Sequence, residues 1–421
     1  RPIHEIFCEL SKKSVRDQTV SNKKSEERRT KQMRMIFTLG GAVHNDNRKC
    51  IFEEVYRRNE DPEYLFVVYD QETGTITYEG QIEDGTVRYL PQESDLIEKG
   101  VVILPEKVEE YESTAQLVKD LQDHIHKGVQ YPQEFERLDV FYVLATWLSD
   151  RLDVIAYRRA KGHKGHGKSR WGNEVVGPLC RRAIRISCAS KAALYRLIEL
   201  FHGTLIMDEA DIKHSELYYD YVKILNQGYK RGNPVVLVDV DTHEPISFDV
   251  FGPKLIMTRG SFADPALEDR CITHKASKLT RNDIPRHLPP EYKEEEKKLR
   301  NQLLMWRLKN YNTPLVLDKE FEQLPREPRI VEILSPIASI IDDPQVRIQL
   351  KDFAKARSDE IRDETRDSIE ADVARAIIQM KISGLPLQVG KIAEQVRLES
   401  RMTEEEFTDR RCGAIIRRDL G

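Results

Sequence analysis

The order of apolar and polar positions divides this 421-residue chain into strand-rich and helix-rich regions. Between about 49 and 104 short apolar runs dominate, and residues 64–69 and 75–79 flank a turn containing Gly74, which predicts a β-hairpin. Residues 113–127 and 133–151 carry apolar side chains at helical spacing. From residue 152 onward apolar runs alternate with helical stretches, which predicts an α/β fold with a parallel sheet and helical crossovers.

This α/β region has a definite expected order of elements. The pattern predicts strands at 152–157, 185–187, 203–209 and 254–258, helices at 170–176, 191–202 and 218–228, a hairpin at about 235–250, and a helical lid at 294–310. On the first of the preceding helices, His124 and His126 have no evident carboxylate or cysteine partner, which favours surface positions over metal ligation.

One segment of this region has the residues of a phosphate-binding turn. Residues 162–169 read Gly-His-Lys-Gly-His-Gly-Lys-Ser and fit G-x-x-x-x-G-K-[ST], the P-loop. Its glycines let backbone amides surround an anion, Lys168 would reach the β- and γ-phosphates, and Ser169 would offer its hydroxyl to Mg²⁺. The predicted nucleotide-binding residues are Gly162, Gly165, His166, Gly167, Lys168, Ser169 and Arg170.

An apolar run that ends in two carboxylates follows this segment. Residues 203–209 end in Asp208 and Glu209, 40 positions after Lys168. Asp208 would hold Mg²⁺ together with Ser169, and Glu209 would orient the attacking water. The alternative is a buried strand that ends in a solvated acidic turn. The combination with the phosphate-binding turn favours an ATPase whose cofactors are ATP and Mg²⁺.

The order of these motifs resembles the AAA+ superfamily. The string Asp-Glu-Ala-Asp at 208–211 does not indicate a DEAD-box helicase, because too little sequence follows residue 310 for a second RecA-like domain. Within AAA+, six stretches are similar to replicative helicases of plasmids, integrated elements, archaea and phages, of the self-loading MCM-like type. They are 162–169, 192–198, 203–211, 224–232, 251–254 and 267–270.

This resemblance implies further catalytic residues. A polar sensor caps the strand between the two Walker strands, which by position is Thr258, with Arg259 as a second candidate. An arginine shortly afterwards reaches the γ-phosphate bound by the neighbouring subunit, and here it would be Arg270. The alternative for Arg270 is a surface arginine paired with Glu268 or Asp269. In the lid, Arg300 or Arg307 would meet nucleotide from the same subunit or would be an ordinary helix-face residue.

The resemblance also implies DNA contacts. The hairpin at about 235–250 would project into the pore of a ring, but its tip (Asp239, Asp241, His243, Glu244) is acidic, which suits phosphate contact poorly. Lys230 and Arg231 at its base are better placed, and His243 is a further candidate. Helices at 368–382, 390–396 and 403–418 predict a helix-turn-helix or winged-helix module. Arg410, Arg411, Arg417 and Arg418 would contact DNA, whereas Glu404 to Glu406 favour the alternative of protein contact.

Composition narrows the function classes. With a net charge of −4, a uniformly basic coat is excluded, although residues 1–34 form a basic arm that would be a solvated segment or a nucleic-acid contact. Six scattered cysteines without a C-x-x-C pair predict free thiols in a reducing compartment. No apolar run approaches the ~18 residues of a membrane span, so a cytoplasmic location without membrane contact is expected.

These patterns predict an α/β protein with an AAA+ parallel-sheet core. The expected regions are a basic arm and β-rich accessory domain (1–110), a helical linker (111–151), the ATPase with its lid (152–312), a linker (313–356) and a winged-helix-like domain (357–421). The predicted function is an ATP-dependent DNA translocase or helicase, a homo-hexamer on single-stranded or forked DNA in replication of a mobile element or plasmid. The alternatives are a non-translocating initiator or loader and a non-enzymatic DNA-binding regulator.

Overall fold

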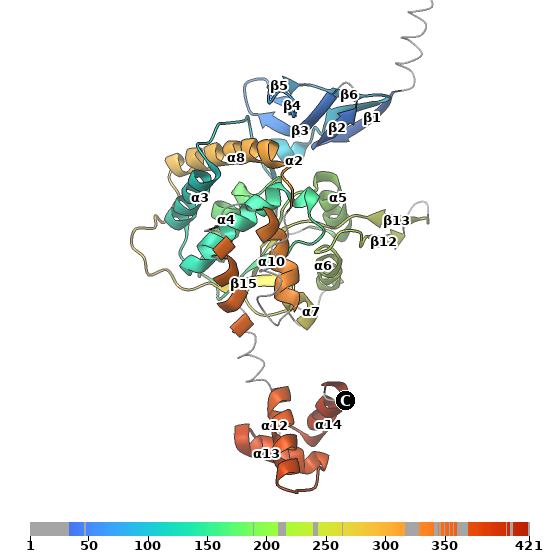
Figure 1. Cartoon of the computed structure of the whole chain (residues 1–421), viewed down its shortest axis with the longest axis vertical. Coiled ribbons are helices and arrows are strands. Elements are labelled where there is room, and N and C mark those ends of the chain that lie inside the picture. Colours follow the sequence, from blue (N-terminus) through green and yellow to red (C-terminus); the bar gives the residue numbers. More distant parts are fainter. Residues whose placement is uncertain are drawn as a thin grey trace, which may run out of the picture. The chain divides into compact units, whose positions relative to one another are not determined.

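The computed structural model divides into two compact units (Figure 1). Unit 1 comprises Arg1–Leu317 and Ile333–Asp343, and unit 2 comprises Asp318–Glu332 and Pro344–Gly421. The structure describes residues 33–45, 48–187, 189–208, 216–238, 243–262, 264–315, 328–340, 344, 347–348, 350–352, 354–356, 358–359, 369–400, 402–404 and 407–419. The basic arm predicted within residues 1–34 lies almost entirely outside these residues.

Unit 1 contains a six-stranded sheet of order β15-β9-β14-β11-β10-β8. The first five run parallel, and β8 pairs antiparallel with β10. In sheet order they are β15 (Cys271–Lys275), β9 (Tyr157–Lys161), β14 (Lys254–Thr258), β11 (Leu205–Met207), β10 (Ala183–Ile186) and β8 (Val102–Ile103). The prediction of a mixed α/β fold with a parallel sheet is therefore confirmed. β14 lies between β9 and β11, the place that the resemblance implied for the strand ending at Thr258.

The strand that enters the glycine-rich segment was predicted wrongly. It runs from Tyr157 to Lys161, whereas residues 152–156 contribute only an isolated bridge between Val154 and Lys230. The apolar residues before it are buried without forming a strand. The prediction was placed too early because it took this buried apolar run for the strand. β9 itself reads as polar because it contains Arg158 and Arg159, but both are buried in ion pairs.

Helices pack on both sides of this sheet. They are α3 (Thr114–Gly128), α4 (Gln133–Trp147), α5 (Lys191–Phe201), α6 (Glu216–Gln227), α7 (Pro265–Glu268) and α8 (Pro290–Asn310). Ser113 and Ser190 cap α3 and α5 by accepting a backbone N–H, as N-cap serines do. The predicted lid is one long helix, α8, that packs against α3 and α4 (Figure 1). The surface position predicted for His124 is wrong, since this side chain is buried and its ring stacks on Tyr292 with 4.0 Å between centroids.

The hairpin predicted near residue 240 is present. It consists of β12 (Val235–Val238) and β13 (Pro245–Phe248), and it extends outward from the sheet beyond α5 and α6 (Figure 1). Residues 239–242 at its tip lie outside the described residues.

The N-terminal β-rich region forms two small sheets within unit 1. One has the order β2-β3-β4-β5, formed by β2 (Gly40–Asn45), β3 (Arg48–Arg57), β4 (Glu63–Asp70) and β5 (Ile76–Glu79). The predicted β4–β5 hairpin is confirmed, with Gly74 at φ 72° in its turn. The other sheet pairs β1 (Arg34–Thr38), β7 (Val87–Pro91) and β6 (Ile82–Asp84), and a short helix α2 (Asp95–Glu98) leads to β8.

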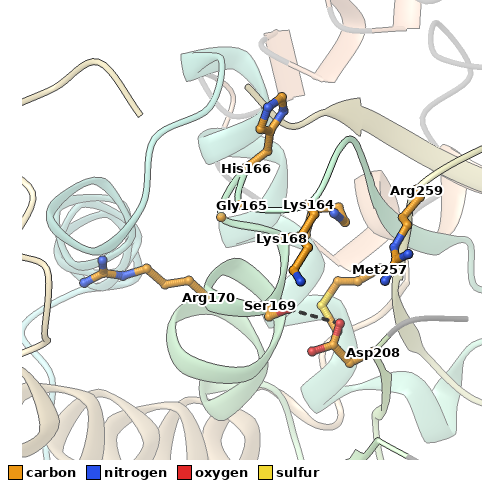
Figure 2. Close-up of a pocket in the computed structure, with 10 residues that line it drawn as sticks. Lys164, Gly165, His166, Lys168, Ser169, Arg170, Asp208, Met257 and Arg259 are labelled. Atoms are coloured by element: carbon orange, nitrogen blue, oxygen red, sulfur yellow. Dashed lines mark hydrogen bonds between the residues drawn. The ribbon is translucent and has the colours of Figure 1, made fainter. Parts of the chain in front are cut away.

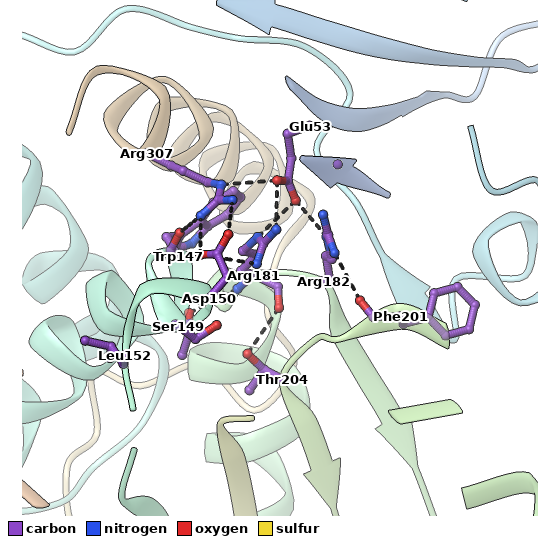
Figure 3. A network of polar contacts seen from close by, with 12 residues as sticks. Glu53, Trp147, Ser149, Asp150, Leu152, Arg181, Arg182, Phe201, Thr204 and Arg307 are labelled. Carbon is purple, nitrogen blue, oxygen red and sulfur yellow. Dashed lines mark hydrogen bonds and ion pairs between the residues drawn. The ribbon is translucent and has the colours of Figure 1, made fainter. Parts of the chain in front are cut away.

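A buried ionic cluster ties this region to the parallel sheet (Figure 3). Glu53 of β3 accepts hydrogen bonds from Arg181 at 2.9 Å, Arg182 at 2.7 Å and Arg307 at 3.1 Å. Arg307 of α8 also pairs with Asp150 at 2.7 Å. Burial alone would raise the pKa of Glu53, but the three guanidinium groups lower it to about 2. The guanidinium of Arg307 therefore makes its ion pairs within this cluster.

The neighbouring Glu54 predicts a pH dependence of stability. It is 1% exposed, and burial raises its pKa from 4.5 to about 8 although its carboxylate accepts a hydrogen bond from the Gln92 amide at 2.7 Å. Because the folded chain holds this proton more tightly, its stabilising contribution is full below pH 4.5 and is lost as pH rises through 8. Glu54→Gln should remove this dependence, so the variant gains stability relative to wild type by up to about 1.4 kcal/mol per pH unit.

The measurement is urea unfolding of both proteins between pH 5 and 8, followed by tryptophan fluorescence. Glu53 does not interfere, because its lowered pKa changes stability only between pH 4.5 and about 2. If the free energy of unfolding varied with pH in the same way in both proteins, the raised pKa of Glu54 would be contradicted.

Unit 2 contains a three-helix core. It is formed by α12 (Ile369–Ile382), α13 (Val389–Ser400) and α14 (Asp409–Asp419), which bury Val373, Ile392, Val396, Phe407 and Ile415 between them. The three predicted helices are confirmed, but the last begins at Asp409 rather than at 403. The described residues from 369 onward contain no strand, so the wing of a winged helix stays a prediction.

The stretch 313–356, interpreted as a linker, contains a helix. α10 (Pro328–Ile340) buries Leu334 and Ile337, although Pro336 lies inside it. Four cysteines among the described residues, Cys50, Cys180, Cys271 and Cys412, are buried and belong to no disulfide. Within the described part of the chain, no helix combines the length and the hydrophobicity needed to cross a bilayer.

Candidate functional site

The glycine-rich segment 162–169 connects β9 to a helix. Gly165 and Gly167 have φ of 82° and 77°, in the left-handed region that glycine adopts without steric cost. The amide of Gly162 donates to the carbonyl of Thr258 on β14 at 3.1 Å, which fixes the start of the turn against the sheet. The helix that follows is π-helical over Arg170–Val176 and is labelled η2. The sequence therefore predicted both the turn and the helix, but not the wider helical winding.

A cavity of about 210 Å³ opens beside this turn (Figure 2). It lies at the carboxyl ends of the parallel strands, where ligands bind in open α/β sheets. Its lining consists of Lys164, Gly165, His166, Gly167, Lys168, Ser169, Arg170, Asp208, Met257 and Arg259. Most of the predicted nucleotide-binding residues, together with Asp208, therefore share one cavity.

Polar contacts order this cavity. The Lys168 ammonium donates to the carbonyl of His163 at 2.9 Å, and the Ser169 hydroxyl donates to Asp208 Oδ1 at 3.1 Å. The second carboxylate oxygen of Asp208 accepts from the Asn173 amide at 2.9 Å. Arg170 instead extends away from Asp208 and donates to the carbonyl of Pro285 at 2.6 Å (Figure 2).

These groups fit a magnesium-bound triphosphate. A turn rich in backbone amides and an ammonium group suit phosphate, and a hydroxyl next to a carboxylate suits Mg²⁺, which usually takes few protein ligands and keeps phosphate oxygens and waters. Among the described residues no group of three or more His, Cys, Asp or Glu side chains forms a possible metal site, so an all-protein cage is not found there. Ser169 and Asp208 are the side chains that would hold the ion.

The sensor candidate that faces the cavity is Arg259, not Thr258. Met257 and Arg259 line the cavity, whereas Thr258 is 1% exposed and does not. Successive side chains of a strand point to opposite faces, so the register of β14 decides which of them faces a ligand. Thr258 Oγ1 has no hydrogen-bond partner within the described structure. Glu209, the candidate for orienting water, lies outside the described residues.

Arg270 follows α7 and is held within its own chain. Its guanidinium donates to Asn226 Oδ1 at 2.8 Å and to the carbonyl of Ala266, and it lies over the Tyr229 ring at 4.6 Å from the centroid. Glu268, one of the partners considered for it, instead pairs with Arg159.

A second buried polar cluster, centred on Asp139, anchors the two ends of the glycine-rich segment. No pattern in the sequence indicated this cluster. Asp139 of α4 accepts hydrogen bonds from Arg158 at 2.5 Å, Tyr131 at 2.6 Å and Trp171 at 2.8 Å. Arg158 precedes the segment on β9 and Trp171 follows it on η2, so one carboxylate fixes both ends of the turn. His274 stacks on Tyr131, and its pKa is lowered well below the ordinary value by burial and by Arg158.

The lid arginines lie elsewhere. Arg300 is buried and donates to the carbonyl of Pro178 at 2.9 Å and to Glu296 at 3.0 Å. Neither Arg300 nor Arg307 lines the cavity, so the reading of both as helix-face residues fits the structure better than nucleotide contact.

The predicted DNA-binding residues occupy separate places. Lys230 is exposed, whereas Arg231 donates to the carbonyls of Leu152 and Ser149 and lies over the Phe251 ring at 4.4 Å. His243 is exposed beside the hairpin tip with φ of 57°. In unit 2, α14 exposes all four of its predicted contacts, Arg410, Arg411, Arg417 and Arg418.

Fold and cavity together define a mixed α/β protein with a glycine-rich turn at the carboxyl ends of the parallel strands. No family model matches the chain, and no curated protein matches it. Solved structures give distant similarities. The apo A form of the NrS-1 C-terminal region aligns with a TM-score of 0.36 and 11% identity over 86% of this chain and 83% of that chain. A full-length MCM homolog from Methanopyrus kandleri aligns with a TM-score of 0.37 and 10% identity over 76% of this chain and 75% of that chain.

Proposed function

We propose that this chain is an ATP hydrolase of the AAA+ class that moves along DNA. The observation that carries the proposal is the meeting of Lys168, Ser169, Asp208 and Arg259 around one cavity at the carboxyl ends of parallel strands. The position of β14 between β9 and β11 supports the AAA+ assignment, since the superfamily places its sensor strand there.

The residues that this proposal uses have distinct roles. The amides of the glycine-rich segment and Lys168 bind the β- and γ-phosphates, and Ser169 with Asp208 holds Mg²⁺. When bound, Mg²⁺ would neutralise charge on the phosphate oxygens. Glu209 orients the attacking water. Arg259, which directly follows β14 and lines the cavity, would stabilise the charge that grows during phosphoryl transfer. Arg270 would act on the nucleotide of a neighbouring subunit, which requires a ring, proposed to be a hexamer.

Arg259 and Thr258 make a matched test of the sensor role. Arg259→Ala should lower kcat about 10²–10³-fold, the usual cost of losing one charge-stabilising donor in an active site. Thr258→Val has nearly the same shape and removes a hydroxyl without a hydrogen-bond partner in the described structure, so it should change kcat less than about twofold. Steady-state ATP turnover measures both. A larger loss of kcat in Thr258→Val than in Arg259→Ala would instead assign the sensor role to Thr258.

The DNA part of the proposal rests on exposed cations. Lys230 at the base of the β12–β13 hairpin and the four arginines of α14 are exposed and suit phosphate contact. Single-stranded or forked DNA in replication of a mobile element or plasmid is the proposed substrate.

A non-translocating initiator or loader is the second candidate. The hairpin residues 235–250 contain no lysine or arginine, and Arg231 at their base is engaged by the carbonyls of Leu152 and Ser149. A hairpin of this composition favours partner exchange over DNA translocation. Stimulation of ATP turnover by single-stranded DNA separates the two candidates: a motor should be stimulated several-fold, whereas unchanged turnover would favour the switch.

A further inference from the structure

The carboxylate of Asp208 is held at both oxygens by one helical turn. Ser169 donates to Oδ1 at 3.1 Å, and Asn173 donates to Oδ2 at 2.9 Å. The two donors are four positions apart, a spacing that places side chains on the same face of a helix. No motif of the sequence drew attention to Asn173.

The close approach of η2 to the sheet makes the second contact possible. A Cβ on Gly172 would lie 2.1 Å from Met257 Sδ, so the absence of a side chain lets the helix backbone lie directly against β14. A Cβ on Gly177 would lie 2.4 Å from Ile206 on β11, the strand that directly precedes Asp208. η2 is π-helical, a winding often found at functional sites.

We infer that Asn173 is a positioning residue for Asp208 in the magnesium–nucleotide site, an inference that rests on the proposed function. A serine hydroxyl has one proton and two lone pairs, so Ser169 can donate to Asp208 while its oxygen faces a cation. Asn173 fixes the opposite edge of the carboxylate. Its amide does not ionise, so this contact persists across the physiological pH range. Contacts of this kind, one step removed from a metal, typically change metal affinity 10–100-fold when they are removed.

The test compares Asn173→Ala with Glu174→Ala, an exposed neighbour on the same helix. Each full-length protein is titrated with a fluorescent ATP analogue in excess EDTA and then with Mg²⁺ at a fixed analogue concentration. Asn173→Ala should bind the metal-free analogue within about twofold of wild type, because Asp208 is not a phosphate ligand. It should need about 10–100-fold more Mg²⁺ for the half-maximal metal-dependent change. Glu174→Ala should match wild type in both.

The Mg²⁺ requirement decides the inference. A wild-type Mg²⁺ requirement in Asn173→Ala would overturn the positioning role while leaving the proposed function intact. Absence of any nucleotide binding by the wild-type protein would overturn both. If Asn173→Ala fails to bind even the metal-free analogue, Asn173→Leu replaces it, since this variant keeps a similar shape but loses the donor. Its Mg²⁺ requirement should rise by about the same 10–100-fold, and a wild-type requirement would overturn the inference.

Discussion

Replacing Lys168 with alanine should lower ATP turnover by at least about 10²–10³-fold, the loss expected when a charge-stabilising donor is removed from an active site. The Lys168 ammonium lies in the cavity with Ser169 and Asp208, and it donates to the carbonyl of His163 across the turn. It would therefore act twice, once by closing the turn and once by binding phosphate. Both kcat and the affinity for nucleotide should fall.

The control is Lys127→Ala on α3. This lysine is exposed and pairs with Glu295 at 3.0 Å, outside the cavity, so its removal changes the net charge equally without touching the proposed phosphate site. Phosphate release under saturating Mg-ATP measures turnover, and a fluorescent nucleotide titration measures binding. Equal ATP turnover in both variants would show that this cavity is not the site of ATP hydrolysis.

Replacing Glu53 with alanine should destabilise unit 1 by about 3–5 kcal/mol, the cost of breaking a buried ion pair by removing one partner. Three guanidinium groups converge on this carboxylate, and Arg181, Arg182 and Arg307 are each at most 6% exposed. Asp150 remains as a partner for Arg307, but the charges of Arg181 and Arg182 would lose their main compensation.

Glu63→Ala provides the matched control. Glu63 pairs with Arg57 at 3.5 Å, and its side chain is 50% exposed, so its loss should cost at most about 1 kcal/mol. Urea unfolding followed by tryptophan fluorescence reports on unit 1, because Trp147, Trp171 and Trp306 all belong to it. Similar unfolding midpoints for the two variants would contradict the role given to the cluster.

The elements that sequence predicted best are those with local causes. The glycine-rich turn has a fixed spacing and needs particular backbone angles at Gly165 and Gly167, so a short motif identifies it. β14 was predicted with its observed bounds, since Lys254–Thr258 is an apolar run between clear breaks. The starts of α3 and α5 follow from their serine caps in the same way, whereas α4 has no capping side chain and ends at Trp147 rather than at the predicted residue 151.

The features that sequence missed depend on distant partners. Glu53 and Arg307 are 254 positions apart, so no local pattern shows that they meet, and a polar strand such as β9 reads as exposed. The residue that β14 presents to the cavity depends on strand register, which composition does not reveal; this is why Thr258 was placed before Arg259. Asn173 escaped notice because its contact with Asp208 needs two glycines to bring η2 against the sheet.

The pairing of β8 with β10 determines where this chain can be divided for expression. A fragment starting at residue 111, the boundary predicted before the helical linker, would lack both β8 and Glu53. β10 would then become a bare sheet edge, open to strands of other molecules, and such edges promote aggregation. Shortened recombinant forms that keep unit 1 whole should remain monodisperse, whereas the fragment that starts at residue 111 should precipitate.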